Sequence, residues 1–148
     1  MKTDLLIIGS GPGGYRAAGY AARNGLSVVV AERDQAGGTC LNAGCIPTKC
    51  LAHDASAAPS DFASAMERKA LVTQQLRTGV EQLLSAPGIT LVKGQAAFTD
   101  EHTVTIGDTT VEADNIIIAT GSESRMPSIT GIDNPRVITS TEALQLQS

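Results

Sequence analysis

Three closely spaced cysteines are the part of this sequence best suited to chemistry. Cys40, Cys45 and Cys50 fall within eleven residues, in a stretch that also holds Gly44 and Pro47. Five residues of an ideal helix leave two side chains ~140° apart, so a bridge between Cys40 and Cys45 needs a loop or a distorted first turn. Gly44 and Pro47 fit such a turn. We interpret Cys40 and Cys45 as a disulfide that opens and closes.

The residues after the second cysteine predict a helix that would activate it. Pro47 suits the first turn of a helix that runs on through residues 48–52, since the missing N–H costs little there. Cys45 would then lie near the helix N-terminus, where a thiolate is stabilised. Lys49, one turn further on, adds a second positive influence.

Two other interpretations of the cysteines stay open on the residues alone. All three could be small apolar core residues, as free cysteines commonly are. A zinc site built from Cys40, Cys45, Cys50 and His53 is possible by composition, but no tight Cys-x-x-Cys pair supports it. We therefore predict no metal, and we expect Cys50 to pack on the helix.

A glycine-rich loop near the N-terminus predicts a phosphate site. Gly9, Gly11 and Gly14 stand between an apolar strand, residues 3–8, and an alanine-rich helix, residues 15–23. In that context the three glycines permit a tight turn, a close approach to a pyrophosphate and close packing of the helix on the strand. The phosphates would sit at the helix N-terminus, where unpaired N–H groups point at them.

A second strand, residues 27–31, completes a β-α-β unit and ends at Glu32. A carboxylate at that position can accept hydrogen bonds from an adenosine ribose. It also disfavours a 2′-phosphate, because two negative charges would face each other.

The other elements complete an α/β pattern. Residues 60–86 hold no proline and show apolar residues at helical spacing, which predicts a long amphipathic helix that packs on the core and ends at Pro87 and Gly88. Residues 115–119 predict a fully buried strand, and residues 124–148 a connector with little secondary structure. Between the long helix and the strand at residues 115–119 we expect a small β-meander with strands at residues 89–92, 95–98, 103–106 and 109–111.

Composition excludes several classes of protein. The chain has 148 residues, enough for one domain, with a net charge of −4 and no run of Lys or Arg to neutralise a phosphate backbone. Two tyrosines, two phenylalanines and no tryptophan are too few for base stacking, so we predict no nucleic-acid partner. No segment approaches the ~20 apolar residues of a membrane helix. The first apolar run is too short for a signal peptide and the cysteines are clustered, so we predict a cytoplasmic protein without a membrane partner.

These motifs, taken together, resemble those of the pyridine nucleotide–disulfide oxidoreductases. The resemblance covers the whole chain and is most specific in residues 37–49, Gly-Gly-Thr-Cys-Leu-Asn-Ala-Gly-Cys-Ile-Pro-Thr-Lys. It extends to residues 15–22, to the Ala-Thr-Gly-Ser turn at 119–122 and to residues 140–144. Within the family the sequence is most similar to the dihydrolipoamide dehydrogenases.

The resemblance implies a Rossmann-like domain that binds FAD. Cys40 is similar to the thiol that meets the substrate, and Cys45 to the thiol that lies against the flavin. The cofactor-binding residues that it implies are Gly9, Gly11, Gly14, Glu32, Arg33, Gly38, Thr39, Lys49, Ala96, Thr120, Gly121 and Ser122.

The resemblance also implies a reaction and its partners. A dihydrolipoyl thiolate, carried by a 2-oxo acid dehydrogenase complex, would attack Cys40 and displace Cys45. Two electrons would then pass through FAD to NAD⁺ in a homodimeric enzyme. A glutathione- or mercuric-reductase type, a non-catalytic thiol redox sensor and a nicotinamide-binding module are the alternatives.

The sequence lacks several features of that family. It has no second Gly-x-Gly-x-x-Gly and no His–Glu pair, and His53 and His102 stand in contexts that predict exposed side chains. We interpret residues 1–148 as the first segment of the FAD-binding domain, without the NAD-binding and dimer-interface domains. We expect the isolated chain to bind FAD weakly or not at all, to have no NAD-linked turnover and to expose apolar surface that favours self-association.

Overall fold

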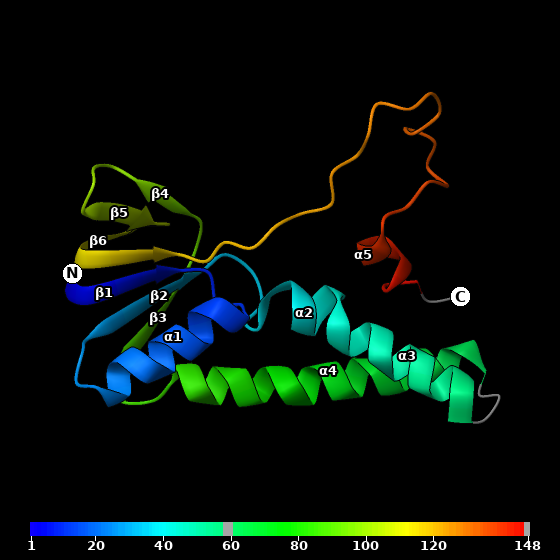
Figure 1. Ribbon diagram of the computed structural model, residues 1–148, viewed down its shortest axis with the longest axis horizontal. Coiled ribbons are helices and arrows are strands. Elements are labelled where there is room, and N and C mark those ends of the chain that lie inside the picture. Colours follow the sequence, from blue (N-terminus) through cyan, green and yellow to red (C-terminus); the bar gives the residue numbers. More distant parts are fainter. Residues whose placement is uncertain (58–60, 147–148) are drawn as a thin grey trace.

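The protein consists of a six-stranded sheet, a helix that lies along one face of it, and further helices that extend past one end (Figure 1). The computed structural model describes residues 1–57 and 61–146. The strands are β1 (Lys2–Ile8), β2 (Val28–Glu32), β3 (Ile89–Lys93), β4 (Ala96–Phe98), β5 (Thr103–Ile106) and β6 (Thr109–Ile118). The helices are α1 (Pro12–Arg23), α2 (Gly38–Ala43), α3 (Cys45–Ala57), α4 (Phe62–Leu84) and α5 (Ser140–Ala143).

The strand order is β3-β2-β1-β6-β5-β4, which confirms the α/β prediction. β3, β2, β1 and β6 run parallel, and β5 and β4 are antiparallel additions at one edge. β1 and β2 are interior strands of the sheet, and their near-continuous apolar runs are buried on both faces. Leu6 and Ile7 are both fully buried, although they point to opposite faces.

Two clusters of apolar side chains hold the sheet in place. On one face, Leu5, Ile7 and Val30 pack with residues of α1 and with Leu84 of α4. On the other face, Leu6 and the residues beside it pack with side chains of β5 and β6, such as Val104. The antiparallel strands therefore cover the face that the helices leave open.

The meander is smaller than the sequence predicts, because β3 does not belong to it. β3 pairs in parallel with β2, with Val30 opposite Leu91, after the crossover through α2, α3 and α4. The strands predicted at 109–111 and 115–119 are one strand, β6. Its middle alternates buried and exposed residues, with Val111 and Ala113 buried and Glu112 and Asp114 exposed, which is the two-residue period of a strand.

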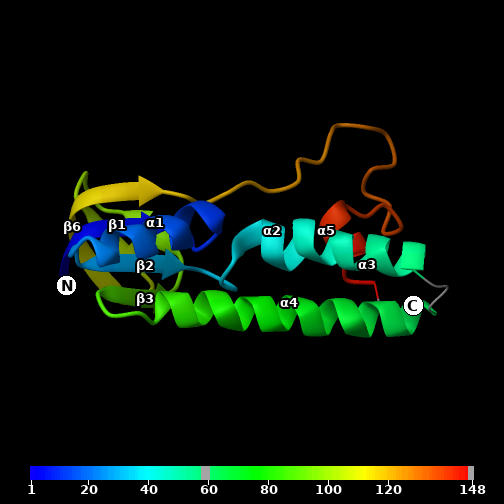
Figure 2. The ribbon, with the colours of Figure 1, turned by 60° about the horizontal axis from the view of Figure 1, so that its bottom comes forward.

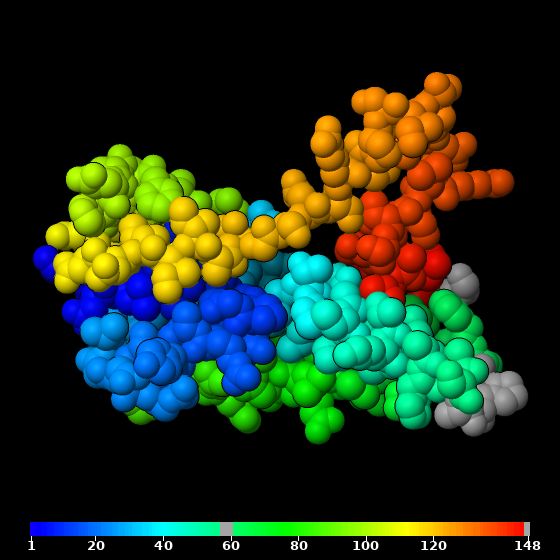
Figure 3. All heavy atoms as spheres, viewed as in Figure 1, coloured from blue at the N-terminus to red at the C-terminus, as the bar shows by residue number. Residues whose placement is uncertain are grey.

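The prediction that residues 115–119 are fully buried is wrong. Ile117 is 38% exposed and Ile118 is 66% exposed. They are uncovered because the chain beyond β6 leaves the sheet: residues 119–139 arch away from the body as an extended segment, orange in Figure 3, before α5. That segment has little secondary structure, as predicted for a connector.

The long helix is confirmed, but only one end of it packs on the core. Val80 and Leu84 contact the cluster beneath the sheet, whereas Phe62, Leu71 and Leu76 are exposed. Figure 2 shows the reason: α4 extends well past the sheet and runs alongside α3. Its amphipathic pattern therefore overstates how much of it is buried.

Polar contacts cap α4 and α5 at their N-termini and join α5 to α4. Asp61 caps α4 by accepting a hydrogen bond from the Ser64 amide at 3.0 Å. Thr139 and Glu142 form a capping box around the start of α5. Lys69 of α4 donates a hydrogen bond to the Leu144 carbonyl at 2.7 Å, which attaches the end of the connector to α4.

Three single features complete the description of the fold. His53 and His102 are exposed, as expected. Across residues 1–57 and 61–146, no group of side chains is arranged to hold a metal ion. No helix in the same ranges has both the length and the apolar composition to cross a membrane.

Candidate functional site

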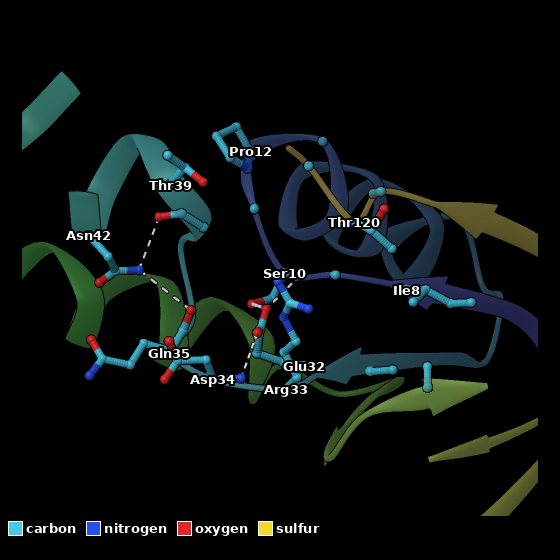
Figure 4. Close-up of a pocket in the computed structure, with 18 of the residues that line it drawn as sticks. Ile8, Ser10, Pro12, Glu32, Arg33, Asp34, Gln35, Thr39, Asn42 and Thr120 are labelled. Carbon is cyan, nitrogen blue, oxygen red and sulfur yellow. Dashed lines mark hydrogen bonds between the residues drawn. The ribbon is translucent and has the colours of Figure 1, made fainter. Parts of the chain in front are cut away.

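A cavity of about 560 Å³ opens at the carboxyl ends of the parallel strands (Figure 4). Its walls are the loop after β1, the turn after β2, the residues after β3 and the residues after β6. Ligands of open α/β sheets bind at this edge. The lining includes most of the residues predicted to bind a cofactor, namely Gly9, Gly11, Glu32, Arg33, Gly38, Thr39, Ala96, Thr120, Gly121 and Ser122, and it also includes Cys40.

The glycine loop brings backbone, rather than side chains, to the cavity. Gly9 has φ +106°, and a Cβ there would lie 2.3 Å from the Ala119 carbonyl oxygen. Gly11 caps α1 without any side-chain hydrogen bond to the first amides of the helix. The N–H groups and the positive end of the α1 dipole therefore face the cavity, an arrangement that favours a phosphate.

Gly14 lies outside the cavity lining, and its role is in packing. A Cβ on Gly14 would stand 1.9 Å from the Gly9 carbonyl oxygen and 3.4 Å from a methyl group of Ile7. Only a glycine lets α1 approach β1 this closely. The third glycine of the motif thus sets the distance between the helix and the strand that present the loop.

Glu32 is held by three donors at the end of β2. It accepts hydrogen bonds from the Ser10 amide at 2.9 Å, from the Ser10 hydroxyl at 2.5 Å and from the Asp34 amide at 2.9 Å. Burial alone would raise the pKa of Glu32, but these hydrogen bonds, with a smaller contribution from the charge of Lys93, bring the pKa below its ordinary value. Glu32 is therefore a buried, ionised acceptor.

The turn after β2 contacts the glycine loop directly. The Gly37 amide donates to the Ser10 carbonyl at 3.1 Å. Gly38 has φ +63°, and a Cβ there would lie 2.7 Å from the Gly11 Cα. On the outer side, Lys93 donates to the Asp34 carbonyl at 2.7 Å. These contacts fix the turn against the loop.

A break between two helices brings Cys40 and Cys45 together. α2 ends at Ala43, Gly44 is its C-cap, and α3 begins at Cys45. A Cβ on Gly44 would lie 3.0 Å from the Thr39 carbonyl oxygen and 3.4 Å from the Cys40 Cα. The distorted turn that the spacing requires is therefore present, and a side chain at position 44 would crowd it.

The three cysteines are free thiols with different surroundings. Cys40 is half-buried, Cys45 is exposed and Cys50 is buried on α3, as expected for a packing residue. A hydrogen bond between the Cys40 and Cys45 side chains, followed by burial, raises the pKa of Cys40, while the Lys49 charge opposes the rise. Cys45 and Lys49 lie outside the cavity lining.

Several lining residues carry no role in the sequence-based prediction. Ser10 and Asn42 fall inside the two recognised motifs, but at positions where the motifs state no chemistry. Asp34 and Gln35 belong to the turn after Glu32, and Gln95 lies beside Ala96. A strand end at Glu32 followed by Gly37 and Gly38 is the one signal that could have drawn attention to this turn.

Taken together, the loop, the carboxylate and the cavity have the arrangement of a dinucleotide-binding α/β domain, with the thiol of Cys40 in the cavity lining. The sequence matches the family described as pyridine nucleotide-disulphide oxidoreductase over residues 3–148. The chain belongs to that family.

Among similar proteins, the dihydrolipoyl dehydrogenase of Haloferax volcanii is 44% identical over 88% of this chain and 32% of its own length. The dihydrolipoyl dehydrogenase of Staphylococcus aureus is 38% identical over 99% of this chain and 36% of its own length. A solved structure, the Cu(II) complex of the HOCl-induced flavoprotein disulfide reductase RclA from Escherichia coli, superposes with a TM-score of 0.95. It is 36% identical, and the match covers 100% of this chain and 35% of that one. The chain thus spans about a third of the length of these proteins.

Proposed function

We propose that the cavity binds FAD and that Cys40 and Cys45 exchange a disulfide with a dithiol substrate beside it. The observation that carries this proposal is that Cys40 lines the same cavity as Gly9, Gly11 and Glu32. A thiol and a phosphate site therefore share one chamber, as a flavin-linked thiol reaction requires.

The residues present fit a dinucleotide. The volume is within the ~300–1,000 Å³ of small-molecule sites. The amides at the start of α1 offer donors for a pyrophosphate. A carboxylate has about four lone-pair sites, and Glu32 uses three for Ser10 and Asp34. The remaining site, on Oε1, is available to a ribose hydroxyl.

The cysteines supply the thiol chemistry. In the oxidised protein, a substrate thiolate attacks Cys40 Sγ, the Cys40–Cys45 bond breaks and Cys45 leaves as a thiolate. The second substrate thiolate then attacks the substrate sulfur of the mixed disulfide and releases Cys40. The substrate dithiol becomes a disulfide, and the protein gains the two electrons as a dithiol. FAD bound in the cavity would accept those electrons from the dithiol.

For the substrate we propose a dihydrolipoyl group of a 2-oxo acid dehydrogenase complex, with NAD⁺ as the final acceptor in a homodimeric enzyme of the cytoplasm. The names of the curated relatives, at 38–44% identity, support this choice. A second candidate is a disulfide reductase of another substrate, which the name and the close superposition of the RclA structure favour. Both candidates use the same two thiols.

Cofactor binding is tested by titrating the purified chain with FAD and recording absorbance between ~350 and ~550 nm. Because the cavity is open on one side, we expect weak but saturable binding that ADP displaces and NADH displaces less well. We also expect the flavin band to differ in the Cys45→Ser variant. The absence of saturable binding, or a stronger preference for NADH, would contradict the proposal.

Thiol exchange is tested by mixing the oxidised chain with dihydrolipoamide, quenching with acid and locating the adduct by peptide mass spectrometry. We expect the transient adduct on Cys40 and none on Cys45. A chain that no oxidant converts to the Cys40–Cys45 disulfide would contradict the reaction. Faster reduction by glutathione than by dihydrolipoamide would favour the second candidate.

A further inference from the structure

A polar contact joins the long helix α4 to the segment that carries the first redox thiol. Arg77 of α4 donates from Nε to Asn42 Oδ1 at 3.0 Å, and from Nη1 to Gln74 Oε1 at 2.9 Å. Arg77 and Asn42 are both half-buried. A planar guanidinium that is held at two of its donors points in one direction. α4 therefore presents a fixed donor to α2.

The contact with Arg77 determines which way the Asn42 amide faces. Arg77 has donors only, so it must meet the amide oxygen, and the amide NH₂ must point to the opposite side. There Asn42 Nδ2 donates to the Ala36 carbonyl at 3.0 Å. It also donates to the Gly38 carbonyl at 3.1 Å, a hydrogen bond drawn in Figure 4. One side chain thus connects α4 to the turn at residues 36–38.

The turn at residues 36–38 supports both the phosphate loop and the helix that bears Cys40. Its Gly37 amide donates to the Ser10 carbonyl of the phosphate loop at 3.1 Å. Its Gly38 is packed against Gly11 so closely that a Cβ would lie 2.7 Å from the Gly11 Cα. The same turn begins α2, which bears Cys40. Displacing the turn would move the phosphate loop and the thiol together.

We propose that Arg77 is a positioning residue that acts through Asn42 to hold the 36–38 turn, and with it the phosphate loop and Cys40. Arg77 itself does not line the cavity. The inference rests on the proposed function only in the identity of what the site binds. Its geometry is independent of that identity.

The test compares Arg77→Met with the unchanged chain in two measurements. The first is the rate at which iodoacetamide alkylates Cys40, followed by peptide mass spectrometry, and the second is the dissociation constant for FAD. Loosening α2 frees Cys40 from burial and from Cys45, both of which raise its pKa. We expect alkylation about tenfold faster and FAD binding about tenfold weaker, the factor that corresponds to one charge-assisted hydrogen bond.

Two further variants control for a general effect on α4. Arg68 is another arginine of α4. It forms an ion pair with Asp54 of α3 at 3.2 Å and no hydrogen bond with Asn42. We expect Arg68→Met to leave both measurements unchanged. Arg77→Lys keeps the charge but lacks the planar guanidinium that fixes the direction of the donor, so it should restore only part of the loss. Equal effects of Arg68→Met and Arg77→Met would overturn the proposal.

A double-mutant cycle distinguishes positioning through Asn42 from a purely structural role. In an Asn42→Ala background the connection is already broken, so Arg77→Met should change either measurement less than about twofold. An undiminished effect in that background, or none in the unchanged chain, overturns the proposal. If the unchanged chain binds no FAD, the proposed function fails, but the alkylation rates still decide the role of Arg77.

Far-UV circular dichroism shows whether Arg77→Met folds. If it does not fold, a variant of Asn42 still tests the proposal. Asn42→Asp still accepts a hydrogen bond from Arg77 but has no NH₂ to donate to Ala36 and Gly38. It should reproduce the faster alkylation. Alkylation at the unchanged rate would overturn the proposal.

Discussion

Glu32 ends a buried strand, and its charge is balanced by hydrogen bonds rather than by an ion pair. Ser10 and Asp34 provide three donors, and among the described side chains no cation forms a salt bridge with it. A buried carboxylate held in this way supports the loop that it faces. Its loss should therefore affect the fold as well as ligand binding.

We expect Glu32→Gln to lower the free energy of unfolding by ~1–3 kcal/mol, because an amide NH₂ cannot accept from the donors that surround it. The pKa of Glu32 in the folded protein lies below the ordinary value of 4.5. Its contribution is therefore fully present above that value and is lost as the pH falls through the folded-state pKa. Urea unfolding of both proteins across the acidic range measures this.

The difference in free energy of unfolding between the unchanged protein and Glu32→Gln should shrink as the pH falls, because the amide that the substitution introduces does not titrate. Glu112→Gln serves as the control, since Glu112 is exposed and, among the described side chains, forms a salt bridge with Lys2 alone. A difference that stays constant from neutral to acidic pH would show that the Glu32 charge has no part in stability.

The sequence predicts site residues where a local motif determines the backbone conformation around them. Gly9, Gly11 and Glu32 follow from a loop between a strand and a helix, and all three line the cavity. Arg77 lies 35 residues from Asn42, and no local pattern indicates that contact. Ser10 and Asn42 stand within motifs, but their hydrogen-bond partners depend on how the turn at residues 36–38 packs.

At the scale of elements, α1 packs so closely against the end of β1 and the loop after it that Gly14 has no room for a methyl group. Gly14 of α1 and Gly79 of α4 are both helical glycines. A Cβ on Gly14 would lie 1.9 Å from a backbone oxygen of Gly9, whereas a Cβ on Gly79 would meet nothing within 4 Å. The two positions therefore form a matched pair.

We expect Gly79→Ala to stabilise the protein by ~0.5–1 kcal/mol, since alanine loses less backbone entropy in a helix. Gly14→Ala gains the same entropy but forces the helix from the strand, so we expect a net destabilisation of ~1–3 kcal/mol. Chemical denaturation of both variants measures the difference. Stabilisation by Gly14→Ala would mean that α1 is free to move away from β1.

The differences between predicted and observed elements have one physical origin. A short apolar run shows that a strand forms, but its partner depends on the crossover that precedes it. β3 follows α4 and so pairs in parallel with β2, although its sequence is equally typical of the first strand of a meander. Likewise the apolar run at Ile117 and Ile118 predicts burial, which requires a covering element that the described residues do not provide.

At the scale of the whole molecule, apolar side chains without a cover are concentrated at the end of β6 and along the connector. Ile118 is 66% exposed, and Met126, Ile129 and Val137 along the same extended segment are also exposed. Exposed apolar surface of this kind favours association. Leu71 of α4 is equally exposed, also at 66%. α4 belongs to neither β6 nor the connector, and it packs on the sheet through the other apolar cluster.

We expect the 148-residue chain to self-associate through this surface. Ile118→Ser removes an apolar side chain worth ~1.5–3 kcal/mol when buried, so the association constant should fall about tenfold or more. Leu71→Ser removes the same exposed fraction from α4 and should leave association unchanged. Sedimentation equilibrium at several concentrations measures both. An average mass that does not depend on concentration, or equal effects of the two substitutions, would show that the end of β6 is not where copies of the chain meet.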